Sequence, residues 1–117
     1  MAVNVLQREG VIILKLSGKI MGKASDELKK VLNEQLANVS GTPKFLLDFG
    51  DVSMMDSSGL GTLMGTHIST VQKGGRIAVI NVGTNIKNLI VRSRLITTFE
   101  HFDDEDEAIA ALTSASN

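Results

Sequence analysis

The sequence predicts an α/β fold: one domain with a mixed, mostly parallel sheet of four to five strands and about four helices. Short apolar runs alternate along the chain with longer segments in which apolar residues recur every three or four positions. Clusters of Gly, Ser, Asn or Asp separate these segments and mark turns. Because 117 residues with 43% hydrophobic and 21% charged content suit one globular core, residues 1–117 are expected to form a single domain.

The first part of the chain is expected to form a hairpin, a helix and a buried strand. Residues 3–7 alternate apolar with polar side chains, and residues 11–16 are a β-branched run, with a tight turn between them. A helix should follow over about 24–38, where apolar residues line one face. After Pro43, residues 45–49 are expected to form a buried strand that ends in a polar, glycine-containing loop.

The second part continues the alternation of helices and strands. The expected elements are a helix over 58–73, a strand over 76–80, a helix over 85–92 capped by Thr84, an edge strand over 97–102 and a helix over 103–112. Residues 113–117 are expected to fray. This order implies right-handed crossovers and a largely parallel sheet, whose functional residues gather at the carboxyl ends of the strands.

Composition excludes several classes of function. The chain has 12 basic and 13 acidic residues and no Trp or Tyr, which disfavours nucleic-acid binding. Without Cys there is no disulfide or thiol chemistry, and two separated His residues give no zinc pattern. The acidic run at 103–107 lacks the spacing of a calcium loop and is expected to be a solvated helix start, and no Walker loop is present. We therefore expect no metal and no cofactor.

The sequence also bears on location and assembly. The N-terminal segment has no basic region followed by an apolar run, so it does not resemble a signal peptide. Apolar runs stop at about five residues, far below the roughly 20 that span a bilayer. We expect a cytoplasmic protein without membrane insertion that is a monomer or a weak dimer.

The segment 56–61, Asp-Ser-Ser-Gly-Leu-Gly, lies where the third strand leads into the second helix. A helix N-terminus carries free N–H groups and partial positive charge, which favour an anion. The hydroxyl of Ser57 is therefore placed either to carry a phosphate or to cap the helix, which is worth about 1 kcal/mol, and position alone favours the cap. Asp56 either orients Ser57 or accepts its proton during transfer or, as the favoured alternative, caps the loop by accepting hydrogen bonds from backbone N–H groups. Ser58 is expected in the first turn of the helix.

The glycines and the apolar residues in and around this segment have two interpretations each. Gly59, Gly61 and Gly65 weaken a helix by up to about 1 kcal/mol each, and close approach by a partner or packing on the sheet explains them equally well. Leu60 is either a partner contact or, preferably, a core residue. The methionines expected to fill the core are Met54, Met55 and Met64.

A serine hydrolase is the enzyme class to test against this pattern. The sequence has no Gly-x-Ser-x-Gly elbow. His67 is ten residues beyond Ser57 on the same expected helix, roughly 15 Å along its axis, and cannot activate that hydroxyl. The sequence does not place His101 relative to Ser57, and we expect it on the surface of the edge strand. A non-enzymatic protein is the favoured interpretation.

Residues 55–61, Met-Asp-Ser-Ser-Gly-Leu-Gly, resemble the signature of the STAS domain family, and most closely that of the bacterial anti-sigma factor antagonists within it. The stretches 16–20, 74–77 and 86–90 also match. The order of the expected elements fits this family over nearly the whole chain.

This resemblance implies a protein-binding switch. In that family the first serine after the aspartate, here Ser57, is the phosphoacceptor, and its neighbours contribute to the recognition edge. The unmodified protein binds an anti-sigma factor that is also a serine kinase, and so frees a sigma factor. Phosphorylation ends the binding and a protein phosphatase restores it. The expected recognition residues beside Ser57 are Asp56, Ser58, Gly59 and Leu60.

The loop at 19–23 is a second candidate for partner contact, through Met21, Gly22 and Lys23. Met21 stands where the family usually has an acidic residue, which bears on the choice of partner. Arg94 stands where a glycine is common, and we expect it to alter only a local turn. The alternative function is a non-catalytic STAS subunit of a larger signalling scaffold or lipid-transport assembly, without a phosphorylation cycle.

Overall fold

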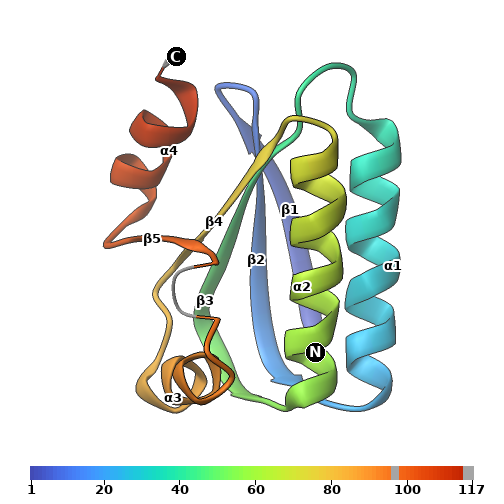
Figure 1. Cartoon of the computed structure of the whole chain (residues 1–117), viewed down its shortest axis with the longest axis vertical. Coiled ribbons are helices and arrows are strands. Elements are labelled where there is room, and N and C mark those ends of the chain that lie inside the picture. The colour runs from blue at the N-terminus through green and yellow to red at the C-terminus, as the bar shows by residue number, and fades with distance from the viewer. Residues whose placement is uncertain (96–97, 115–117) are drawn as a thin grey trace.

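A computed structural model describes residues 1–95 and 98–114. Its five strands lie side by side in the order β1-β2-β3-β4-β5, so that each strand pairs with its neighbour in sequence (Figure 1). The strands are β1 (Ala2–Arg8), β2 (Val11–Ile20), β3 (Lys44–Met55), β4 (Arg76–Ile80) and β5 (Glu100–Phe102). The helices are α1 (Lys23–Asn38), α2 (Ser57–Gln72), α3 (Thr84–Arg92) and α4 (Glu105–Thr113).

The mixed, mostly parallel sheet that the sequence predicts is confirmed. Strands β1 and β2 are antiparallel, and the pairs β2–β3, β3–β4 and β4–β5 are parallel. The hairpin turns through Glu9 and Gly10, whose φ angles are 52° and 81°. Two successive positive φ values are typical of the tight turn whose twist matches that of antiparallel strands.

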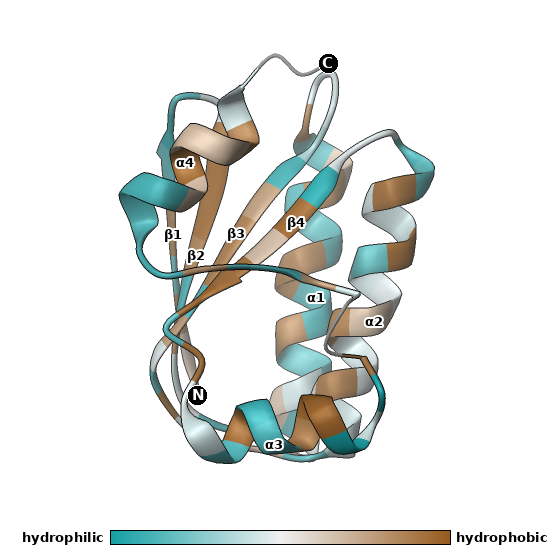
Figure 2. Ribbon diagram, turned by 60° about the vertical axis from the view of Figure 1, so that its left-hand side comes forward, coloured by the Kyte–Doolittle hydropathy of each residue, from teal (hydrophilic) through white to brown (hydrophobic). Residues whose placement is uncertain are grey.

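Helices cover the sheet on both faces and produce two apolar cores. Helices α1 and α2 lie side by side on one face, and α4 lies on the other (Figures 1 and 2). Along β3, Phe45 and Leu47 belong to the first core, whereas Leu46 between them belongs to the second. Side chains of a strand alternate between its faces, so a continuous apolar run is what a strand buried on both faces requires.

The expected end of the third strand was wrong. Residues 50–55, predicted as a loop, continue β3 and pair with the end of β2, where Gly18 lies opposite Val52 and Ile20 opposite Met55. The two strands reach this pairing through register shifts, and Gly18 has a φ of 84°. Polar and glycine residues on both partners concealed the extension, because tertiary pairing overrides weak local β propensity.

Helix starts differ slightly from the prediction. Helix α2 begins at Ser57 with Asp56 as its N-cap, and α4 is capped by Asp104, which accepts from the Glu107 N–H. Thr84 was predicted to cap the third helix, but it is the first helical residue, and the N-cap position is Gly83. Several residues at these junctions are Ser, Thr, Asp or Gly, all of which are common N-cap residues. The sequence alone therefore places the N-cap of a helix only to within a residue or two.

The C-terminal part is largely as expected. The edge strand is shorter than predicted, and Thr97, where it was expected to start, lies outside the described residues. Thr113 was expected to fray but ends α4, with its hydroxyl donating to the Ile109 carbonyl at 2.7 Å. Residues 115–117, the rest of that predicted tail, are not among those described. Arg94 has a φ of 60° in the turn after α3, as expected of a position where glycine is common.

The acidic run does more than start a helix. Arg8 at the end of β1 donates to the Glu105 carboxylate at 2.9 Å and lies 2.8 Å from an oxygen of Asp106. These contacts attach the first turn of α4 to the hairpin. Within the part of the chain that the structure describes, none of the helices is long and apolar enough to cross a membrane.

Candidate functional site

The candidate site lies at the carboxyl end of β3, where the chain enters α2. Asp56 has an extended backbone and caps the helix: its Oδ1 accepts from the Gly59 N–H at 3.0 Å. The same oxygen accepts from the Ser58 hydroxyl at 2.6 Å. Capping by Asp56, which the sequence favoured for this residue, is thereby confirmed.

Asp56 also joins two junctions that are far apart in sequence. Its second oxygen, Oδ2, accepts from the Gly22 N–H at 3.2 Å, between β2 and α1. The Asp56 N–H in turn donates to the Ile20 carbonyl at 3.3 Å. The β2–α1 and β3–α2 junctions therefore meet at one end of the sheet (Figure 1), which brings the second predicted contact segment beside the first.

These contacts lower the pKa of Asp56 below its ordinary value of 3.8. The largest cause is the hydrogen bond from the Ser58 hydroxyl, followed by the N–H groups of Gly59 and Gly22. Hydrogen bonds that donate to a carboxylate stabilise its ionised form. Asp56 is therefore a carboxylate at neutral pH and acts only as an acceptor.

The lowered pKa predicts a dependence of stability on pH. A carboxyl group whose pKa falls on folding stabilises the protein above its ordinary pKa, and this contribution disappears as the pH falls through the lowered value. The stability difference between wild type and Asp56→Asn should therefore be full near about pH 7 and should shrink below about pH 4. Urea unfolding at a series of pH values measures it.

Asp51→Asn is the matched control, because this exposed residue on β3 makes no side-chain hydrogen bond or ion pair within the described residues. It should change stability little at any pH. A constant difference between wild type and Asp56→Asn across the series would contradict the assignment of Asp56.

The two adjacent serines differ in their surroundings. Both are exposed, but the Ser58 hydroxyl is held by Asp56 and lies 2.9 Å from the hydroxyl of Ser25 on α1. The Ser57 side chain makes no hydrogen bond to any residue in the described ranges. The interpretation of Ser57 as the helix cap is therefore wrong: Asp56 caps the helix and the Ser57 hydroxyl is free.

Two of the predicted recognition residues are buried. Leu60 is only 4% exposed and packs in the first core, as the favoured alternative had it. Gly59 is buried as well: a Cβ there would lie 2.8 Å from the Ile20 carbonyl oxygen and 2.7 Å from Met55 Cγ. Leu60 thus fills the core, and the absence of a side chain at Gly59 lets the start of α2 approach β2 closely.

The other two glycines of the helix face open space. A Cβ at Gly61 or Gly65 would meet nothing within 4 Å. Packing on the sheet therefore explains Gly59 but not these two. Both line a groove of about 470 Å³ between α1 and α2 that begins at Ser58.

Exposed apolar side chains flank the site. Met21 is 39% exposed and Met54 is 44% exposed, and Gly22 and Lys23 are exposed between β2 and α1. Met54 was expected in the core, which is wrong, because the extended β3 carries it to the surface. Met55 and Met64 are partly buried against the first core, as predicted.

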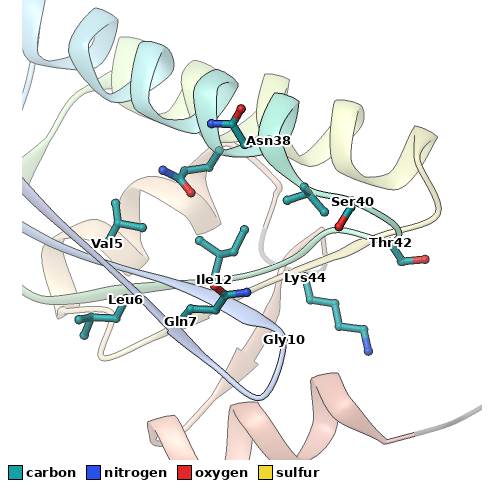
Figure 3. Close-up of a pocket in the computed structure, with 11 residues that line it drawn as sticks. Val5, Leu6, Gln7, Gly10, Ile12, Asn38, Ser40, Thr42 and Lys44 are labelled. Atoms are coloured by element: carbon teal, nitrogen blue, oxygen red, sulfur yellow. The ribbon is translucent and has the colours of Figure 1, made fainter.

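The remaining candidates lie elsewhere. His67 packs edge-on against Phe99, with ring centroids 5.6 Å apart, and His101 is exposed on edge strand β5. A separate hollow of about 460 Å³ lies at the amino end of β3, between β1 and the end of α1 (Figure 3). Val5, Ile12 and Asn38 are among its lining residues. It is remote from the strand end that carries Ser57, and no sequence pattern pointed to it.

Comparisons with known proteins agree with this geometry. The anti-sigma F factor antagonist of Paenibacillus polymyxa is 29% identical over 114 residues, which are 97% of each chain. The anti-sigma factor antagonist SpoIIAA in its unphosphorylated form has a TM-score of 0.83 at 20% identity, over 99% of this chain and 100% of that one. The Bacillus SpoIIAA structure in the phosphorylated form has a TM-score of 0.73 at 21% identity, over 94% and 98%.

The same fold occurs in another setting. A sulfate transporter family protein from Wolinella succinogenes has a TM-score of 0.74 at 25% identity, over 92% of this chain and 88% of that chain. The family model described as the STAS domain matches residues 2–108. Because that match covers most of the sequence, the chain belongs to the STAS domain family.

Proposed function

We propose that this chain is an anti-sigma factor antagonist controlled by phosphorylation of Ser57. In its unmodified form it binds an anti-sigma factor with serine kinase activity in the cytoplasm, and it is released when that kinase phosphorylates Ser57. A protein phosphatase then restores the binding form. The chain itself supplies no catalytic residue and needs no cofactor. The observation that carries the proposal is the free, exposed hydroxyl of Ser57 at the start of α2, beside neighbours that are hydrogen-bonded or buried.

In the proposed cycle, the Ser57 hydroxyl at the start of α2 receives the phosphoryl group of ATP. The Ser57 oxygen forms a bond to the γ-phosphorus of ATP while the bond from that phosphorus to the departing ADP breaks. The hydroxyl proton passes to a base of the kinase, since the hydrogen bonds that lower the pKa of Asp56 make its carboxylate a weaker proton acceptor. The names of the relatives support this cycle, because SpoIIAA is described in both unphosphorylated and phosphorylated forms.

Phosphorylation should weaken binding without unfolding the domain. The phosphate adds about −1.5 to −2 charges, and the free N–H groups of a helix N-terminus tolerate them. The partner, however, would have to desolvate the phosphate next to the Asp56 carboxylate, at the end of the sheet where Met21 and Met54 expose apolar side chains. An added charge in a partly apolar interface, beside another negative charge, opposes association.

A pull-down with three forms of the protein tests the proposal. Wild type and Ser57→Ala should capture the same partner, whereas Ser57→Glu should lose it, with an affinity at least about tenfold lower, or about 1.4 kcal/mol. Ser69→Glu is the matched control, because it adds the same charge to α2 roughly 18 Å further along the helix. Equal capture by the Ala and Glu variants at position 57 would contradict the switch.

The alternative is a non-catalytic STAS subunit of a larger signalling or transport assembly. The similarity to a sulfate transporter family protein is the observation that favours it. Intact mass after incubation with ATP and the captured partner separates the two functions. A gain of one phosphate, mapped to Ser57, supports the switch, and an unchanged mass supports the assembly subunit.

A further inference from the structure

Ser25 is a buried polar residue of α1 with no role in the switch described so far. It is 2% exposed, and its hydroxyl oxygen lies 2.9 Å from that of Ser58. Its carbonyl also accepts from the Thr62 hydroxyl at 3.2 Å. The first turns of α1 and α2 are thus joined side by side at the end of the molecule that carries Ser57 (Figure 1).

The direction of the hydrogen bonds in this cluster follows from counting protons. A carboxylate has no proton to give, so in the 2.6 Å contact Ser58 must donate to Asp56. A serine hydroxyl carries a single proton, and that of Ser58 is then used. In the contact between the two serines, Ser25 is therefore the donor and Ser58 the acceptor.

We infer that Ser25 is a positioning residue of the switch: by donating to Ser58, it commits the Ser58 proton to Asp56 and leaves Ser57 as the free hydroxyl of the pair. Ser25 acts through Ser58 and Asp56, which it holds in one arrangement. The consequence for the choice of phosphoacceptor rests on the function proposed above. The hydrogen-bond chain from Ser25 through Ser58 to Asp56 does not depend on that function.

This arrangement disfavours Ser58 as a nucleophile. To attack a γ-phosphorus, the Ser58 oxygen would have to rotate out of the chain and release both of its hydrogen bonds. Rotation would leave the Ser25 hydroxyl, which is shielded from water, without its acceptor, and unpaired buried donors are costly. Ser57 has no such bonds to break. Consecutive hydrogen bonds also polarise one another, so the donation from Ser25 strengthens the bond from Ser58 to Asp56.

NMR titration of the isolated protein tests the chain without any kinase. The pH dependence of the Asp56 carboxyl carbon should show a higher pKa in Ser25→Ala than in wild type, in the same direction as in Ser58→Ala. Thr62→Val is the matched control, because it removes the other hydrogen bond between Ser25 and α2 but leaves the hydroxyl chain intact. Its Asp56 pKa should equal that of wild type.

The rotamer of Ser58 provides a second readout on the same samples. Coupling constants between its α and β protons should indicate one χ1 rotamer in wild type and Thr62→Val, and an average of several in Ser25→Ala. Dispersed amide spectra verify that each variant is folded. An unchanged Asp56 pKa and an unchanged Ser58 rotamer in folded Ser25→Ala would overturn the inference.

Phosphosite mapping with the captured partner kinase separates this inference from the proposed function. Phosphate on Ser57 in wild type, with additional phosphate on Ser58 in Ser25→Ala, supports both. Preferential modification of Ser58 in wild type overturns the inference. If no partner modifies either serine, the proposed function fails, and the titration and rotamer data still decide the role of Ser25.

Discussion

Gly75→Ala is expected to destabilise the protein by about 3 kcal/mol and to lower its melting temperature by roughly 10 °C. Gly75 lies between α2 and β4, and a Cβ there would be 2.1 Å from the carbonyl oxygen of Pro43. That oxygen accepts from the Arg76 N–H at 3.0 Å, so the two segments cannot separate without losing this bond. Because the clash involves backbone, no side-chain rotation relieves it. Urea unfolding and thermal melts measure the loss.

Gly61→Ala is the control for this change. It adds the same methyl group where nothing lies within 4 Å, and should stabilise α2 by about 0.5–1 kcal/mol. The same added methyl group is therefore expected to lower the stability of the protein at Gly75 and to raise it at Gly61. A stability of Gly75→Ala within about 0.5 kcal/mol of wild type would mean that the chain between α2 and β4 moves freely, contrary to its contacts.

Gly59→Ala should change both stability and partner binding. The added methyl would lie 2.8 Å from the Ile20 carbonyl oxygen and 2.7 Å from Met55 Cγ. Overpacking of this kind costs about 1–3 kcal/mol, and it forces the start of α2 away from the sheet. Because Asp56 binds both Gly59 and Gly22, we expect partner affinity to fall along with stability, by about tenfold.

Gly61→Ala again provides the comparison, with chemical denaturation and the pull-down assay as the two measurements. Because Gly61→Ala should raise rather than lower the stability of the domain, any loss of binding in that variant reports direct contact of the partner with the exposed α2 surface. Full stability and full binding in Gly59→Ala would show that the close approach of Gly59 to Ile20 has no role in shaping the proposed binding surface.

Most of the fold follows from local patterns in the sequence. The apolar run at residues 45–49 predicts a strand buried on both faces, and alternate residues of β3 do reach both cores. The continuation of that strand through Gly50 and Asp51 could not be predicted in this way. Its stability comes from pairing with an equally polar segment of β2, a partner that the sequence does not specify.

The site was predictable in its location but only in part in its contacts. The position of Asp56 before a glycine-rich helix start indicates a cap, and the cap is present. Its bond to Gly22 and the contact between Ser25 and Ser58 join residues more than 30 positions apart. Such contacts depend on how α1 and α2 pack together. The burial of Gly59 likewise depends on the position of Ile20, a residue of another strand.

The consecutive order of the strands has a consequence for how the protein assembles. Each parallel ladder joins strands that follow one another along the chain but are separated by a helix, as in the pairing of Ile12 with Phe45. Such pairings must close a long stretch of chain, which makes folding slower than in a bundle of local helical contacts. Ser57, the proposed phosphoacceptor, follows β3, the middle strand, yet lies outside every ladder. Newly made chains should therefore fold at the same rate whether or not that serine is already modified.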